Sequence, residues 1–82
     1  MTNKQIFEKT QDVFREIFDQ PGLVIQRSTS ANDLEEWDSL NHINLVVSIE
    51  KEFGIKFALG ELETLKDVGG MLDLIHRKLT GL

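Results

Sequence analysis

The chain contains no cysteine and few basic residues, and both scarcities limit what it can do. Without cysteine, disulfide bonds and metal sites with thiolate ligands are excluded. Nine lysines and arginines stand against 14 aspartates and glutamates, so the basic surface that nucleic-acid phosphates require is missing. No apolar run is long enough to cross a bilayer, and the first residues lack the apolar region of a signal peptide. We therefore expect a cytoplasmic protein that neither binds nucleic acid nor inserts into membranes.

The length and the charge distribution favour one small domain that binds basic partners. At 82 residues and 40% hydrophobic composition, the chain can build a single apolar core. Four carboxylates and one arginine lie between residues 20 and 38. This acidic concentration favours association with basic surfaces, although charge that only keeps a small domain in solution would look the same. We expect residues 1–82 to form a single domain that is a monomer.

The first predicted helix begins at Thr2, which together with Gln5 has the pattern of a capping box. Apolar residues recur at helical spacing to about Asp19. The dipeptide Pro21-Gly22 then ends the helix. A connection of residues 23–38 follows, and a connection of this length in a small domain usually carries function.

The second predicted helix, residues 39–53, is the centre of the sequence. Ser39 is expected to be its N-cap, because a serine hydroxyl can accept a hydrogen bond from a free N–H group of the first turn. Gly54 is expected to end it in the left-handed conformation. With about 100° between successive residues, the helix is apolar on two opposite faces. One face is a core stripe, and the other is the strip Leu40, Ile43 and Val47.

This apolar strip has two open interpretations. Contiguous exposed apolar surface usually marks an interaction site, so the strip is predicted to dock partner proteins. The alternative is that the connection of residues 23–37 covers it. We favour docking and include Glu50, from the same helix, among the predicted docking residues.

Two more helices are predicted after Gly54. A short helix lies near residues 59–63, and a longer one follows Asp67, its expected N-cap, to about Leu79. The predicted fold class is therefore all-α. It is a small four-helix bundle, three longer helices plus one short helix, with a long connection between helices one and two.

The tripeptide Asp38-Ser39-Leu40 at a helix start, followed by Glu-Lys-Glu-Phe-Gly at the helix end, resembles the acyl carrier protein family. The resemblance covers nearly the whole chain. It implies that Ser39 bears a covalent phosphopantetheine arm whose thiol holds acyl groups as thioesters, with Asp38 and Leu40 as parts of the attachment site. It also implies two kinds of partner, a phosphopantetheinyl transferase and acyl ligase or synthase enzymes.

In this family the acyl chain can retreat between the second and third helices. The resemblance implies that five residues line such a pocket here: Val46, Ile49, Phe57, Leu62 and Leu65. Phe57 and Leu62 are bulkier than the residues common at these positions. This favours a shallow pocket and a short or polar cargo.

The sequence also departs from the housekeeping carriers of fatty-acid synthesis. Those carriers present a row of acids along the second helix, where this chain has Asn41, Asn44, Glu50 and Lys51. Trp37 stands where they usually have a small residue. Trp-Asp-Ser-Leu is more similar to stand-alone carriers dedicated to one pathway, so we predict a specialised carrier.

Other functions remain open at this stage. A carrier-like interaction module without the arm, or a carrier of aminoacyl or peptidyl groups, would have a similar pattern. An enzyme is not expected, because the chain has no Gly-x-Ser-x-Gly elbow and no catalytic residue can be named. His42 is placed with the core face as a packing residue, and its distance from His76 gives no metal-ligand spacing, so no metal site is predicted.

Overall fold

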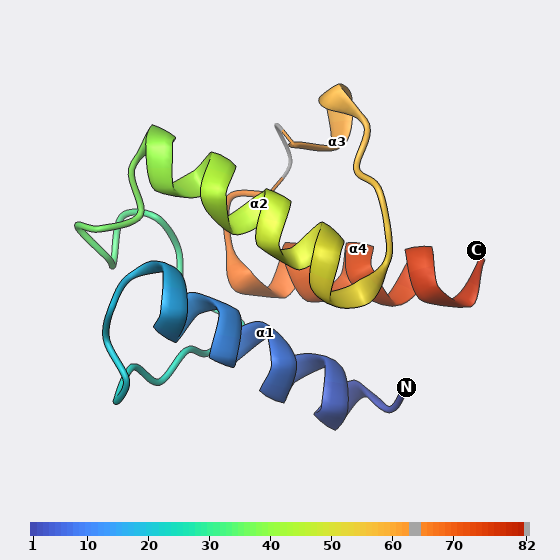
Figure 1. The fold of residues 1–82 in the computed structure, drawn as a ribbon, viewed down its shortest axis with the longest axis horizontal. Coiled ribbons are helices and arrows are strands. Elements are labelled where there is room, and N and C mark those ends of the chain that lie inside the picture. The colour runs from blue at the N-terminus through green and yellow to red at the C-terminus, as the bar shows by residue number, and fades with distance from the viewer. Residues whose placement is uncertain (63–64, 82) are drawn as a thin grey trace.

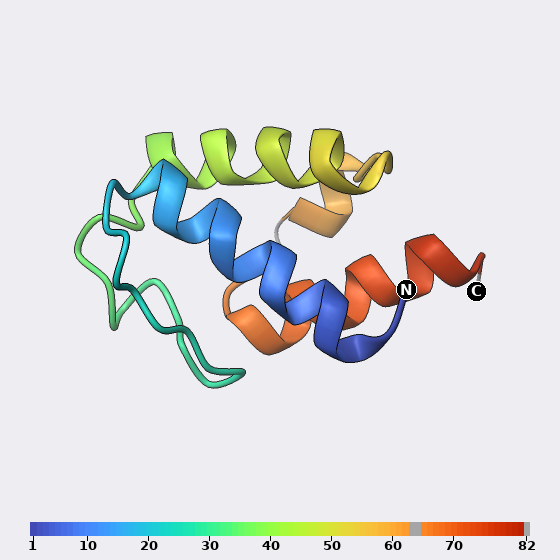
Figure 2. The same ribbon diagram turned by 60° about the horizontal axis from the view of Figure 1, so that its bottom comes forward.

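The structure, a computed structural model, describes residues 1–62 and 65–81, and of residue 62 only the backbone. This part of the chain contains no strand and has four helices: α1 (Asn3–Ile17), α2 (Ser39–Phe53), α3 (Leu59–Leu62) and α4 (Val68–Thr80). In Figure 1, α1 and α2 run in opposite directions and α4 packs behind them. The long connection lies at one end of the molecule, opposite the start of α1 and the end of α4, as Figure 2 also shows. The predicted all-helical bundle with one short helix is confirmed.

Most helix ends are set by the local signals that the sequence contains. The capping box is present, with the Gln5 N–H donating to the Thr2 hydroxyl at 3.1 Å and the Thr2 N–H donating to the Gln5 side chain at 2.9 Å. Gly54 ends α2 with a φ of 66°, in the left-handed region that favours glycine. The Asp67 side chain accepts from the N–H of Gly70 at 2.7 Å and caps α4. Each of these signals is confirmed.

The predicted N-cap of α2 is wrong by one residue. Asp38 is the N-cap, and its carboxylate accepts a hydrogen bond from the N–H of Asn41 at 2.8 Å. Ser39 is instead the first helical residue of α2. Aspartate and serine are about equally good N-caps, so their ranking could not decide between two such neighbours. The Ser39 hydroxyl is therefore not used for capping.

The core lies between α1, α2 and α4. Phe14 of α1 is fully buried at its centre, with its ring in edge-to-face contact with Phe18 at 5.5 Å and with Trp37 at 5.2 Å between centroids. Trp37 thus attaches the end of the long connection to the core. The other fully buried side chains of the cluster come from α2, α4 and the long connection: Leu45, Ile49, Val68, Met71, Ile75 and Ile25.

The long connection is bound to the first turn of α4. The N–H of Val68 donates to the carbonyl of Thr29, and the N–H of Gly69 donates to the carbonyl of Arg27, both at 2.9 Å. A Cβ on Gly69 would lie 3.0 Å from that carbonyl oxygen of Arg27, so the close approach favours glycine. The Arg27 guanidinium also pairs with Asp73 at 2.9 Å. These contacts place residues 30–32 beside the segment that precedes α4.

A charged contact holds the short helix α3 near the end of α4. The Lys78 ammonium lies 2.7 Å from a carboxylate oxygen of Glu61. The hydrogen bond from Lys78, together with the N–H of Ala58, lowers the pKa of Glu61. The contact links α3 to the last turns of α4.

Candidate functional site at the start of α2

Ser39 is exposed at the N-terminus of α2, and its hydroxyl makes no hydrogen bond within the described residues. The first N–H groups of a helix have no intrahelical partner. In α2 the Asp38 carboxylate satisfies that of Asn41, whereas the N–H groups of Ser39 and Leu40 have no partner in the described part of the chain. The helix dipole adds partial positive charge at the same place. A free hydroxyl therefore stands where an attached phosphate would be stabilised.

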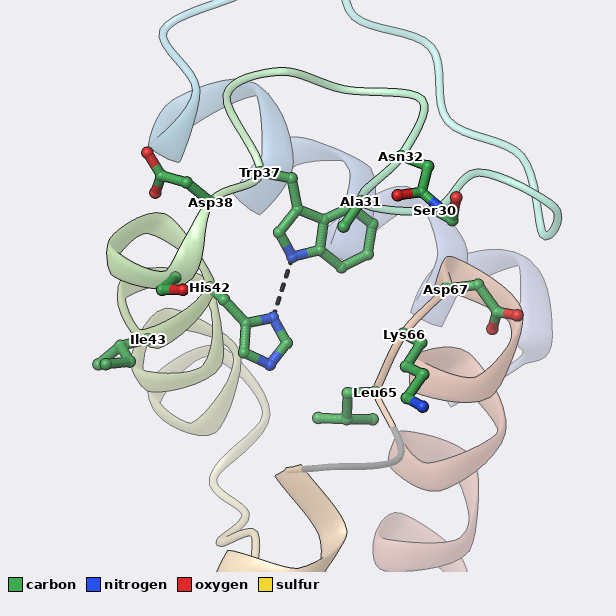
Figure 3. A pocket seen from close by; sticks show the side chains of 11 residues that line it. Ser30, Ala31, Asn32, Trp37, Asp38, His42, Ile43, Leu65, Lys66 and Asp67 are labelled. Atoms are coloured by element: carbon green, nitrogen blue, oxygen red, sulfur yellow. Dashed lines mark hydrogen bonds between the residues drawn. The ribbon is translucent and has the colours of Figure 1, made fainter.

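A pocket of about 640 Å³ opens beside Ser39. Three segments form its walls: residues 30–32 of the long connection, residues 37–43 across the start of α2, and residues 65–67 before α4. Figure 3 shows side chains from all three converging on this space. Apolar groups such as Ile43 and Leu65 alternate with polar ones such as Asn32 and Lys66. The pocket is therefore suited to a ligand that is itself partly polar.

Trp37 and His42 form a hydrogen-bonded pair at the back of this pocket. The indole N–H of Trp37 donates to Nδ1 of His42 at 2.9 Å (Figure 3), and the two rings lie edge to edge with an interplanar angle of 19° and centroids 6.1 Å apart. His42 is half-buried and lines the pocket. The predicted packing role agrees with this contact to the buried Trp37, and the structure adds that the imidazole also forms part of the pocket wall.

The apolar strip of α2 is exposed. Leu40, Ile43 and Val47 are 69%, 60% and 42% exposed. The interpretation that residues 23–37 cover the strip is wrong, because that connection is bound to α4 instead. Leu59, on α3, is 85% exposed and was not predicted as part of this surface. Its helix is too short for hydrophobic spacing to reveal an exposed face.

The comparisons with known proteins decide the family. The family model described as the phosphopantetheine attachment site matches residues 8–75. The acyl carrier protein of Thermosynechococcus vestitus is 32% identical over 96% of this chain and 98% of its own length. The chain belongs to the acyl carrier protein family.

Further relatives agree with this assignment. The acyl carrier protein of Saccharopolyspora erythraea is 34% identical to this carrier, over 90% of this chain and 78% of its own. The solution structure of the holo acyl carrier protein from Geobacter metallireducens superposes with a TM-score of 0.86 at 49% identity, covering 93% of this carrier and 87% of that chain. The carrier thus holds acyl groups, and its cofactor is a covalently attached phosphopantetheine.

The start of α2 fits such a group. Ser39 supplies a hydroxyl without a competing partner in the described residues, and two free N–H groups of α2 are available to its phosphate. The adjacent pocket is within the range of about 300–1,000 Å³ found for small-molecule sites. The geometry at the start of α2 is therefore compatible with the phosphopantetheine that the family carries.

The predicted acyl-pocket residues do not all meet at this pocket. Val46 and Ile49 are buried in the core, and Phe57 is half-buried against it. Leu65 is the member of the predicted set that lines the pocket beside Ser39. The side chain of Leu62 lies outside the described residues. An acyl pocket between α2 and α3 stays a prediction.

Glu50 stays a predicted docking residue, but its carboxylate already has a partner. One of its oxygens accepts a hydrogen bond from the N–H of Phe57 at 2.8 Å. Among the described residues, Glu52, also on α2, pairs with Lys9 of α1 at 3.1 Å. The acidic residues near the end of α2 are therefore engaged within the molecule.

Sequence reasoning missed the pocket and the pair at its back. Residues 30–32 and 65–67 are more than 30 positions apart and carry no shared motif. Trp37 was noted as a departure from the housekeeping carriers, and nothing in its spacing from His42 indicates a ring–ring hydrogen bond. None of the helices that the structure describes is long and apolar enough to cross a membrane.

Proposed function

We propose that Ser39 is the attachment residue and that this carrier presents its acyl thioesters to the enzymes of one dedicated pathway. The observation that carries the proposal is the exposed hydroxyl of Ser39 at the first position of α2, which has no partner among the described residues. A phosphodiester on this hydroxyl would face the free N–H groups and the positive end of the helix. Asp38, the N-cap, and Leu40, the next exposed residue, are proposed as parts of the attachment site.

Partner enzymes are proposed to dock on the apolar strip that begins one residue after Ser39. A transferase, an acyl ligase and a synthase must each approach the same hydroxyl or its arm. Leu40, Ile43 and Val47 extend from the attachment site along α2 and are exposed, so each enzyme would bury them as it reaches Ser39. Glu50 would contribute at the far end of this strip.

In this proposal the carrier is acted on and does not itself catalyse. Nδ1 of His42, the histidine nearest to Ser39 in the chain, accepts from Trp37. The side chain is therefore committed to a structural contact and is not paired with the Ser39 hydroxyl within the described residues. A serine without an activating base is a weak nucleophile. A cytoplasmic location, a single domain over residues 1–82 and a monomeric state stay predictions.

Attachment is tested by intact mass after incubation with coenzyme A and a broad-specificity phosphopantetheinyl transferase. We expect a gain of one phosphopantetheine mass, with fragmentation placing it on the peptide that contains Ser39. A folded carrier that gains no mass would contradict the proposal and favour an interaction module without the arm. Loading with aminoacyl groups in place of acyl groups by the cognate ligase would instead favour a peptidyl-type carrier.

The dedicated pathway is supported by the charges of α2. Asn41 and Asn44 are neutral, Lys51 is basic and exposed, and Glu50 is engaged by Phe57. Enzymes whose basic surfaces recognise a row of carboxylates would find few free ones here. We therefore expect fatty-acid-synthesis enzymes to load or elongate this carrier at least about tenfold more slowly than a housekeeping carrier, since one lost charge pair is often enough for that. Equal rates in a side-by-side elongation assay would contradict the dedicated role.

A further inference from the structure

The imidazole of His42 is fixed as a hydrogen-bond donor toward the pocket beside Ser39. Its Nδ1 accepts the indole N–H of Trp37 at 2.9 Å, so in the neutral ring the proton must be on Nε2. Figure 3 shows the Nε2 edge of the ring turned away from Trp37, toward the segment that contains Leu65. The two rings are nearly coplanar, with centroids 6.1 Å apart, as an in-plane N–H···N hydrogen bond requires, and this bond to the buried Trp37 limits rotation of the imidazole. The pocket therefore receives one N–H donor in a fixed position.

We propose that this pocket is a docking site for the phosphopantetheine arm, in which Nε2–H of His42 donates a hydrogen bond to an amide carbonyl of the arm. Trp37 is the positioning residue, because it selects the tautomer and the orientation of the imidazole. The inference rests on attachment at Ser39, as proposed above. It adds that the arm of this carrier spends part of its time bound to its own protein.

Ser39 is close enough to His42 for an attached arm to make this contact. Ser39 and His42 are three residues apart on α2, and residues at this spacing are neighbours on a helix surface, about 5–6 Å apart at Cβ. Both line the pocket. The first amide of a phosphopantetheine lies only a few bonds beyond its phosphate. An arm that leaves Ser39 toward the pocket therefore brings an amide carbonyl to the His42 side of the wall.

The pocket walls have the alternating character of the arm. Phosphopantetheine consists of short carbon segments joined by two amide groups. Trp37, Ile43 and Leu65 offer carbon surface, whereas Ser30 and Asn32 of the long connection offer hydrogen-bonding groups opposite α2. A long alkyl chain would make no hydrogen bonds to these polar groups, whereas the amides of the arm can. The pocket thus favours the arm over a fatty-acyl tail.

The proposal is tested first by nitrogen NMR of the two histidine rings, with the apo and holo carriers compared at one pH. The chain has only two histidines and one tryptophan, so the three side chains can be followed individually. We expect His42 to show the Nε2–H tautomer in both forms, and the His42 Nε2–H and Trp37 indole signals to shift on attachment. His76, on α4 and lining a different cavity, is the internal control and should not shift.

A second measurement reports on the arm itself. Because the chain has no cysteine, the thiol of the arm is the only thiol of the holo carrier, and its reaction rate with a disulfide reagent reports how often the arm is free. We expect His42→Leu to raise this rate by about two- to tenfold, the change in population that one hydrogen bond controls. His42→Gln, which keeps an N–H donor, should restore most of the protection.

Trp37→Phe separates positioning from packing, because it keeps an aromatic ring but removes the indole donor. We expect this variant to fold, to lose the single His42 tautomer in the nitrogen spectra, and to show faster thiol reaction.

A holo carrier whose His42 signals do not move, or whose thiol reacts equally fast in His42→Leu, would overturn arm docking alone. A folded carrier that gains no phosphopantetheine mass would overturn the proposed attachment as well, so the two failures are distinguishable.

Discussion

Ser39→Ala is expected to abolish attachment of phosphopantetheine while leaving the fold intact. The attachment chemistry needs a hydroxyl at this position. Among the described residues, Ser39 is the hydroxyl that lies both beside the pocket and at the start of α2. The stability of the bundle should change by less than about 0.5 kcal/mol, as is usual for exposed substitutions. Asp38 supplies the N-cap, so alanine at the first helical position removes no structural hydrogen bond known from the described residues.

The experiment compares intact masses after transferase treatment, with thermal unfolding of each variant beside it. Ser30→Ala, in the pocket wall, and Ser48→Ala, within α2, are the matched controls. Both should gain the full mass, because neither hydroxyl is at the start of α2. A mass gain in Ser39→Ala would assign attachment to another hydroxyl. Unfolding of Ser39→Ala would instead mean that the Ser39 hydroxyl has a structural role.

Trp37→Ala is expected to cost about 3–5 kcal/mol of unfolding free energy, the range for large aromatic truncations in a core. The indole is only 5% exposed, contacts Phe14 edge-to-face, and donates to His42. Its loss would open a cavity under the end of the long connection and leave Nδ1 of His42 without its donor. Small domains have total stabilities of about 5–15 kcal/mol, so this variant should be close to unfolding at 37 °C.

The measurement is urea unfolding followed by circular dichroism, because the variant has no tryptophan fluorescence. Trp37→Phe keeps a ring against Phe14 and should lose markedly less stability than Trp37→Ala. Val24→Ala is the second control, since Val24 is in the same connection but is 68% exposed, and it should change stability by less than about 0.5 kcal/mol. A loss below about 1.5 kcal/mol for Trp37→Ala would show that the indole does not anchor the connection.

Several features of this carrier follow from the sequence because the interactions that create them are local. A capping box joins residues three apart, so Thr2 and Gln5 were sufficient to predict the start of α1. The end of α2 at Gly54 was also predictable, because glycine has no Cβ and readily adopts the left-handed backbone conformation found there. The exposed strip Leu40, Ile43 and Val47 follows from helical periodicity. The attachment role of Ser39 was predicted from the resemblance of its surrounding motif to a known family.

Where two local solutions were nearly equal, local sequence signals could not decide between them. Asp38 and Ser39 are both good N-caps, and the structure uses Asp38. The choice matters for function, because it leaves the Ser39 hydroxyl free. Helical spacing likewise placed His42 near the core but could not predict that an indole N–H would hold its ring at the pocket wall.

The sequence by itself determined the helices, most of their caps, the motif around Ser39 and the exposed strip of this carrier. Tertiary structure alone decided the pocket beside Ser39 and the course of the long connection. The reason is the range of the interactions. Helix signals act over three to four residues, whereas the pocket depends on hydrogen bonds from Val68 and Gly69 to Thr29 and Arg27, which bring together segments that share no pattern along the chain.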